Sequence, residues 1–191
     1  MTAPRIPLTV RLGILAVLVV LIQIGLLSQL ALFGVPPDIG PLVVMSVGLL
    51  MGSIPGAVMG FWMGLMVDTA LLQTLGIDSL LYIVVGYGAG RLRELRDPDG
   101  ALVPLAVGAA ATAVTVVGFS IVEFLLGVDA PVSLLLVREI VVTVIVGTLL
   151  AMPVYALVRR VLSPVLPDDF RRRRRRAYTT GGLSPITRSR A

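Results

Sequence analysis

Long apolar stretches alternate with short polar breaks along most of this chain. The first stretch, Leu12–Phe33, has about 22 residues, which is enough for an α-helix to cross a hydrocarbon core of about 30 Å. A cleavable signal peptide usually has a shorter apolar region that ends in small residues, and Leu30-Ala31-Leu32-Phe33 offers no such site. The pattern therefore predicts a first transmembrane helix that is retained in the mature protein.

Five further apolar stretches follow, each bounded by residues that break or begin helices. They predict helices over residues 39–52, 55–72, 79–91, 101–126 and 132–160. Ser53 is expected to cap the second of these five helices, and Asp78 or Ser79 the third. The helices over 39–52 and 55–72 are short for a full span, so we expect them to be tilted, kinked or incompletely spanning.

Composition narrows the class of protein. Hydrophobic residues make up 57% of the 191 residues and charged residues 14%, against about 25% charged residues in an ordinary soluble domain. This balance excludes a soluble globular protein and indicates a polytopic membrane protein. The chain has no Cys, no His and no Lys, because all 16 basic residues are Arg. These absences exclude disulfides, Ser–His hydrolysis, thiolate metal sites, the P-loop lysine and Schiff bases, so we expect no catalysis, no metal and no cofactor.

The arginines sort to one side of the predicted bundle. With six spans, all of the 16 arginines except Arg138 fall on the side of the two termini. The positive-inside rule places that side in the cytoplasm. The sequence thus predicts an all-α polytopic membrane protein, a compact bundle of six transmembrane helices with both termini cytoplasmic. Its predicted parts are a cytoplasmic N-terminus (1–11), the membrane domain (12–162) and a basic, disordered cytoplasmic tail (163–191).

Glycines recur at every fourth position in two of the predicted helices. Gly56, Gly60 and Gly64 form one row, and Gly86 and Gly90 form a shorter one. Within a bilayer, helices associate by close packing, and missing side chains let two backbones approach each other. Two alternatives stay open: these glycines pack the protein against itself, or they form an interface for a partner's transmembrane helix.

Asp68 is an ionisable residue within a predicted span, where a charge costs about 2.5–3.5 kcal/mol on insertion scales. One interpretation is structural: Asp68 accepts hydrogen bonds from Tyr82, Tyr87, Thr69 or the start of the next helix, and so fixes the corner between the two helices. The other is that it binds an ion or a proton during transport. We favour the structural interpretation.

A second polar set lies toward the outer ends of the last two predicted helices. It consists of Glu123, Arg138 and Glu139. Glu123 and Arg138 are expected to pair across the intervening turn, because opposite charges neutralise each other in a medium of low dielectric constant. An ion pair near the membrane interface is favoured over a substrate site.

The C-terminal tail contains six consecutive arginines: Arg171, Arg172, Arg173, Arg174, Arg175 and Arg176. The run has no interleaved aromatic residues and follows closely on a membrane span. We therefore expect it to bind anionic lipid at the cytoplasmic surface, with an acidic partner protein as the alternative and no nucleic acid.

Three segments carry a resemblance to a known family: Gly60-Phe61-Trp62-Met63-Gly64-Leu65-Met66-Val67-Asp68, Leu75-Gly76 and Gly86-Tyr87-Gly88-Ala89-Gly90-Arg91. They resemble the Gly-Phe-x-x-Gly-Leu-x-x-Asp helix, the Leu-Gly turn and the Gly-Tyr-x-x-Gly-Arg helix end of MreD, a family of rod shape-determining membrane proteins of bacteria. About a third of the chain matches closely, and the arginine tail is not part of the family's pattern. The family is also distantly similar to the substrate-binding subunits of energy-coupling-factor transporters, which share a compact six-helix fold.

The resemblance implies a non-catalytic component of the cell-elongation machinery in the bacterial cytoplasmic membrane. Members of the family work with the bitopic protein MreC, with MreB, with RodA and with a class-B penicillin-binding transpeptidase in lateral peptidoglycan synthesis. We accordingly expect a scaffold for the transmembrane segments of partners. The alternative is a small-molecule (vitamin-like) substrate-binding subunit of a transporter, with a cavity lined by Asp68, Glu123 and Arg138.

Overall fold

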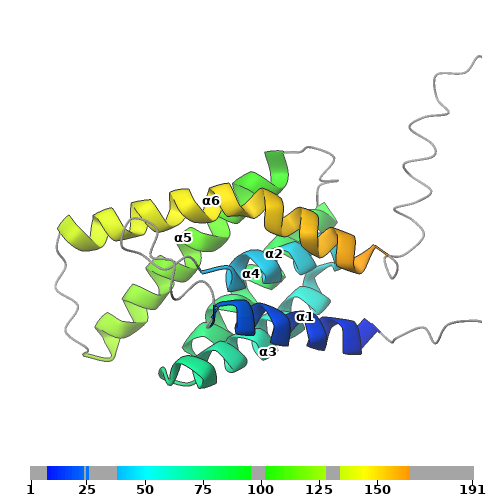
Figure 1. Ribbon diagram of the computed structural model, residues 1–191. Coiled ribbons are helices and arrows are strands. Elements are labelled where there is room, and N and C mark those ends of the chain that lie inside the picture. Colours follow the sequence, from blue (N-terminus) through cyan, green and yellow to red (C-terminus); the bar gives the residue numbers. More distant parts are fainter. Residues whose placement is uncertain (1–7, 24, 26–37, 96–101, 128–133, 164–191) are drawn as a thin grey trace, which may run out of the picture.

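The computed structural model describes residues 8–23, 25, 38–95, 102–127 and 134–163, and this part of the chain is entirely helical, without a β-strand (Figure 1). Its six α-helices are α1 (Leu8–Ile22), α2 (Gly40–Met51), α3 (Ser53–Leu71), α4 (Ile77–Leu95), α5 (Leu102–Leu125) and α6 (Leu134–Leu162). The six helices that the apolar pattern predicts are therefore all present, in the predicted order.

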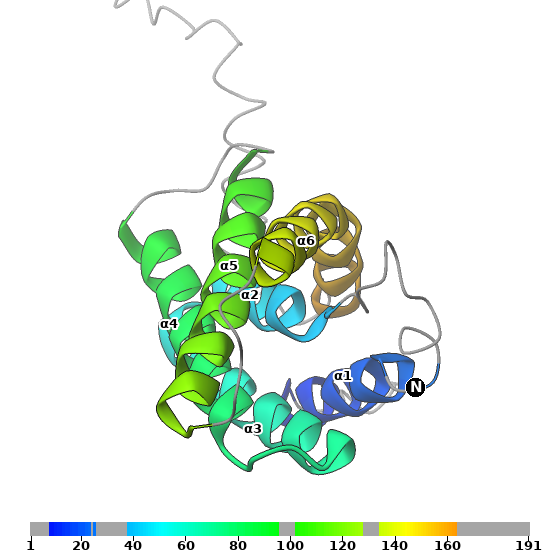
Figure 2. The same cartoon turned by 90° about the vertical axis from the view of Figure 1, so that its left-hand side faces the viewer.

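Helix α2 is the centre of the molecule. Every residue from Gly40 to Leu50 is buried, and Figure 2 shows α2 enclosed by its neighbours. With 12 residues the helix is about 18 Å long, so it is too short to cross a bilayer by itself. Gly52 adopts a φ of 103°, a conformation that favours glycine. This residue alone separates α2 from α3.

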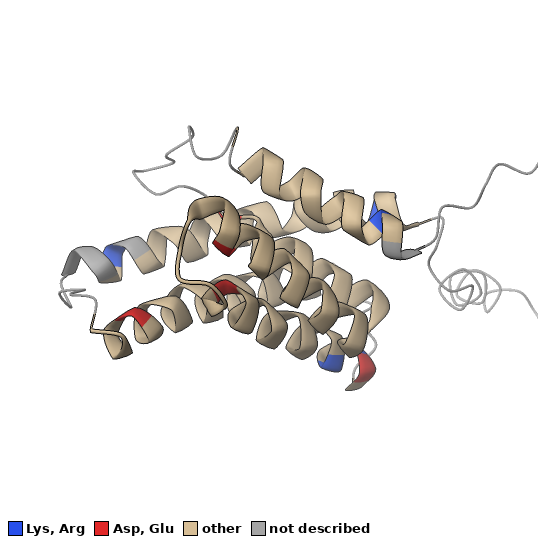
Figure 3. Cartoon of the chain, turned by 90° about the horizontal axis from the view of Figure 1, so that it is seen from below, with Lys and Arg blue, Asp and Glu red and all other residues tan. Residues whose placement is uncertain are grey.

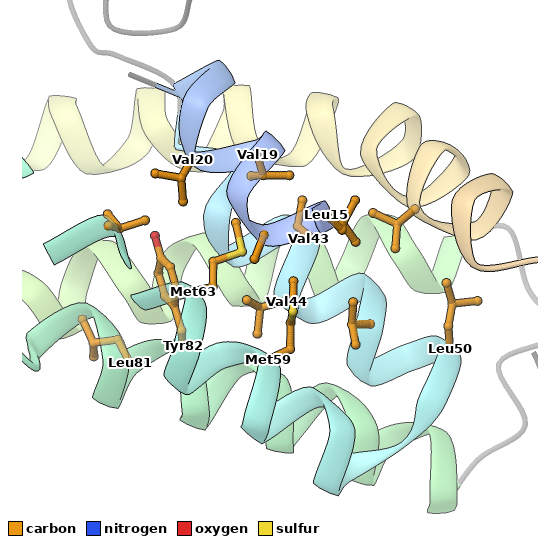
Figure 4. Packing of buried hydrophobic residues seen from close by; sticks show 14 of the residues in the cluster. Leu15, Val19, Val20, Val43, Val44, Leu50, Met59, Met63, Leu81 and Tyr82 are labelled. Atoms are coloured by element: carbon orange, nitrogen blue, oxygen red, sulfur yellow. The ribbon is translucent and has the colours of Figure 1, made fainter. Parts of the chain in front are cut away.

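The apolar core joins α1 to the centre. Leu15 and Val19 of α1 pack in one cluster with Val43 of α2 and with Met59 and Met63 of α3 (Figure 4). A second cluster lies on the other side of α2, where α4, α5 and α6 meet it with small and medium side chains. The two clusters use opposite faces of α2, which explains why that helix is buried all round.

Three helical segments are long and apolar enough to cross a membrane: Ser53–Leu71, Leu102–Leu125 and Ile140–Leu162. The charged residues of the described helices lie at or near the helix ends (Figure 3). This distribution is typical of a membrane protein.

Some predicted boundaries are wrong. Helix α1 begins at Leu8 rather than at Leu12, and the predicted continuation to Phe33 lies mostly outside the described residues. Ser53 does not cap α3, because the N-cap position is Gly52. Neither Asp78 nor Ser79 precedes α4, which already begins at Ile77.

Candidate functional site

Gly56 and Gly86 face each other where α3 meets α4. A Cβ atom added to Gly56 would lie 2.4 Å from the carbonyl oxygen of Gly86, and one added to Gly86 would lie 2.2 Å from the carbonyl oxygen of Gly56. Both distances are far below van der Waals contact, and the atoms in the way are backbone atoms. Neither position can therefore carry a side chain while the two helices keep this distance.

The same close contact runs along both helices. At the other three glycines of the predicted rows, an added Cβ would lie 2.2–2.3 Å from backbone atoms: Gly60 from Tyr82, Gly64 from Ser79 and Gly90 from Ser53. The rows therefore pack the protein against itself, which is one of the two alternatives left open by the sequence. A partner's helix cannot occupy this face, because α3 and α4 already fill it for each other.

Gly88 gives the contrast within the same helix. An added Cβ would have nothing within 4 Å, and the residue is exposed. Gly86 and Gly88 thus differ in what surrounds them, although they are two residues apart in α4.

Asp68 follows the glycine row of α3 and accepts hydrogen bonds from the start of α4. Its side chain is fully buried, and its two carboxylate oxygens accept the N–H groups of Gly76 at 2.7 Å and of Asp78 at 3.3 Å. The first N–H groups of a helix lack partners within the helix, and a carboxylate also suits the positive end of the helix dipole. Asp68 therefore satisfies the start of α4 from the preceding helix.

This arrangement corresponds to one of the partners that the sequence suggests for Asp68, the start of the next helix. The other suggested donors are engaged elsewhere: the Tyr82 hydroxyl with Asp38, the Thr69 hydroxyl with the Leu65 carbonyl, and the Tyr87 ring with Arg91.

A buried polar network at Asp38 was missed from the sequence. Asp38 lies just before α2, and its carboxylate accepts the side-chain N–H of Gln23 at 2.8 Å, the backbone N–H of Gly40 at 2.9 Å and the hydroxyl of Tyr82 at 3.1 Å. Tyr82 is fully buried and stands among the side chains of the core (Figure 4). The network connects the end of α1, the start of α2 and the second turn of α4. An acidic residue placed before Gly40-Pro41 was the available signal, since carboxylates favour helix starts.

We expect Tyr82→Phe to lower the free energy of unfolding by about 2 kcal/mol, because it removes a buried hydrogen bond to a carboxylate. The matched control is Tyr87→Phe, whose ring lies exposed on the same helix and whose change should be below about 0.5 kcal/mol. Thermal unfolding in detergent measures both. Equal effects of the two substitutions would contradict the network.

Glu94 forms a second connection between α3 and α4, at the opposite end of both helices. One of its carboxylate oxygens accepts the N–H of Ser53 at 3.0 Å and the Ser53 hydroxyl at 2.6 Å. Its other oxygen lies 3.4 Å from the guanidinium of Arg91. These hydrogen bonds from Ser53 hold the pKa of Glu94 below its ordinary value.

A lowered pKa means that this contact stabilises the fold above the ordinary pKa of a glutamate and is lost as the pH falls through the lowered value. We therefore expect Glu94→Gln to flatten the acid side of a plot of melting temperature against pH. An unchanged slope in this variant would show that Glu94 does not contribute.

Asp68, Glu123 and Arg138 are not brought together. Arg138 is exposed on α6, Glu123 is partly buried on α5, and no hydrogen bond or ion pair joins any two of the three residues in the described chain. The ion pair expected between Glu123 and Arg138 is thus not formed. The side chain of Glu139 and the six tail arginines, residues 171–176, lie outside the description.

A protein-family model described as rod shape-determining protein MreD matches residues 5–161. The chain belongs to the MreD family. The match includes the first five helices and all of α6 except its last residue, and it ends before the arginine tail. It confirms the resemblance carried by α3 and α4. Membership gives this MreD-family protein a role in rod-shape determination. No curated protein and no solved structure matches the chain.

Proposed function

We propose that this MreD-family protein is a non-catalytic scaffold of the cell-elongation machinery in the bacterial cytoplasmic membrane, where it binds the transmembrane segments of partner proteins. The observation that carries the proposal is the family match over residues 5–161. By family resemblance, the partners are an MreC-like bitopic protein, MreB, RodA and a class-B penicillin-binding transpeptidase. The termini lie in the cytoplasm, where the arginine tail binds anionic lipid.

The packing of the glycines supports a surface for partners on the outside of the bundle. Because α3 and α4 fill each other's glycine rows, the faces left for another helix are the outward ones. Among the three long apolar helices, α6 has the most exposed outward face. Only 11% of its most apolar 18-residue stretch is buried, against 39% for that of α3. Ile145 and Leu149, one turn apart on α6, are 62% and 77% exposed, and both suit packing against an apolar span.

Photocrosslinking in cells tests this proposal. A photoreactive residue at outward positions such as Ile145 of α6 or Val84 of α4 should capture a bitopic cell-wall protein. The matched control is Met63, which is fully buried and should capture nothing outside the chain. The scaffold role would be contradicted if no outward position captured another protein, and the shape role if cells depleted of the protein stayed rod-shaped.

A further inference from the structure

Helix α6 carries a proline near the middle of its apolar segment. Pro153 lies inside the continuous helix Leu134–Leu162, and the segment Ile140–Leu162 is long and apolar enough to cross a membrane. A proline has no N–H group, so the carbonyl oxygen of the residue four positions earlier loses its partner within the helix. In α6 that residue is Leu149, and Figure 1 shows that α6 is bent. Pro153 therefore leaves a backbone acceptor free near the middle of the segment.

The freed carbonyl lies on the side of α6 that faces away from the bundle. The buried residues Gly147 and Ala151 face α5. Leu149 and Pro153 each follow one of them by two residues, which turns an α-helix by about 200°, and both are exposed. A helical carbonyl points toward the residue four positions later, so the oxygen of Leu149 lies beside the exposed ring of Pro153.

The described neighbours of α6 lie on its other side. A freed backbone group in a bilayer is satisfied by a neighbouring helix, by a Ser or Thr side chain or by water. Helices α5 and α2 pack against the buried side of α6, where Ala151 lies. The hydroxyl of the adjacent Thr148 donates to the carbonyl of Val144, at 2.6 Å. These neighbours leave the oxygen of Leu149 to a donor from elsewhere in the membrane.

We propose that the carbonyl oxygen of Leu149 recognises a partner's transmembrane helix that carries a hydrogen-bond donor, the side chain of Ser, Thr or Asn, in the middle of its span. Side chains of this kind form hydrogen bonds between helices within membranes. The exposed side chains of Ile145, Leu149 and Met152 supply the apolar contact around the oxygen. The inference rests on the proposed binding of partner spans to the outward face of α6, and it adds the chemistry that selects the partner.

Synthetic transmembrane peptides of leucine and alanine test this recognition on the full chain in phosphatidylcholine vesicles. One peptide has a single asparagine at its centre, a second has leucine at that position, and a third has the asparagine one turn from an end. Energy transfer between labels on the chain and on the peptide measures binding. We expect the first peptide to bind about threefold more tightly than the other two, or better, since this is the size of one hydrogen bond between membrane helices.

Pro153→Ala restores the N–H group and with it the helical hydrogen bond to Leu149. This variant should melt at a higher temperature, because proline is unfavourable inside a helix, yet it should lose the preference for the central asparagine. The preference is a ratio measured on one variant, so a general change in the fold cancels. An equal preference in the native chain and in Pro153→Ala would overturn the inference, as would the absence of a preference in the native chain.

The matched control for the bend exchanges two neighbours, Met152→Pro together with Pro153→Met. It keeps a proline in α6 but moves the free carbonyl to Thr148, about 100° around the helix. We expect the preference to be lost, and its retention would assign the preference to the bend and overturn the role of the Leu149 oxygen.

Two further outcomes concern the identity of the occupant. If the native chain associated with itself in vesicles without peptide, and Pro153→Ala abolished this association, the acceptor would belong to an interface between two copies and the partner assignment would be overturned. Capture of partners in cells is measured only by the photocrosslinking described above. Failure of the acceptor and failure of the scaffold role can therefore be told apart.

Discussion

Gly86→Ala should destabilise the protein by about 3 kcal/mol or more, although it adds a single methyl group. The added Cβ would lie 2.2 Å from the carbonyl oxygen of Gly56. The clash is with the backbone of α3, so no rotation of a side chain can relieve it, and the two helices must separate along their shared face. We expect a large fall in melting temperature and a lower yield of folded protein purified from the membrane.

Gly88→Ala is the control, because this residue lies in the same helix and has nothing within 4 Å of an added Cβ. Alanine favours the helix over glycine by about 1 kcal/mol, so this variant should be as stable as the native protein or slightly more stable. If the two variants behaved alike, helix propensity rather than the contact with α3 would explain the effect of Gly86.

Asp68→Ala should lower the free energy of unfolding by about 2–4 kcal/mol. It leaves the N–H groups of Gly76 and Asp78 without their carboxylate partner at the start of α4. Asp68→Asn should cost less, since its amide oxygen can still accept one of the two hydrogen bonds. Thermal unfolding or a steric-trapping assay measures both variants.

Glu123→Gln provides the comparison for Asp68. Glu123 makes no hydrogen bond or ion pair in the described chain, so its variant should change stability by less than about 1 kcal/mol. A structural role further predicts that cells carrying Asp68→Asn keep their rod shape. Loss of shape in this variant, with the stability of the protein unchanged, would instead support an ion- or proton-binding role for Asp68.

The helices were predictable because their signal is local. Apolar stretches separated by Gly, Pro and polar residues indicate the order of all six helices, and an ionisable residue in a span, Asp68, marks the corner between α3 and α4. The starts of α3 and α4 were less predictable. Their first N–H groups bind the carboxylates of Glu94 and Asp68, which come from the neighbouring helix. A capping signal in the sequence involves only adjacent residues.

The sequence of a glycine row does not show which helix packs against it. The backbone of another helix in the same chain and the span of a partner both fit a surface without side chains, so Gly60 and Gly64 carry the same signal in either case. The network around Asp38 is similarly non-local, because Gln23 and Tyr82 come from helices distant in sequence. Their pairing requires the three-dimensional packing of α1, α2 and α4.

A double-mutant cycle between Gly56 and Gly86 tests most directly whether the two rows face each other. Each single alanine variant forces α3 and α4 apart at the same point, so the second methyl group meets a contact that is already open. We predict that the double variant loses clearly less unfolding free energy than the two single variants together, with a coupling of about 1 kcal/mol or more. Additive losses, within about 0.5 kcal/mol, would mean that the two glycines face separate surfaces, and the internal packing described for α3 and α4 would be wrong.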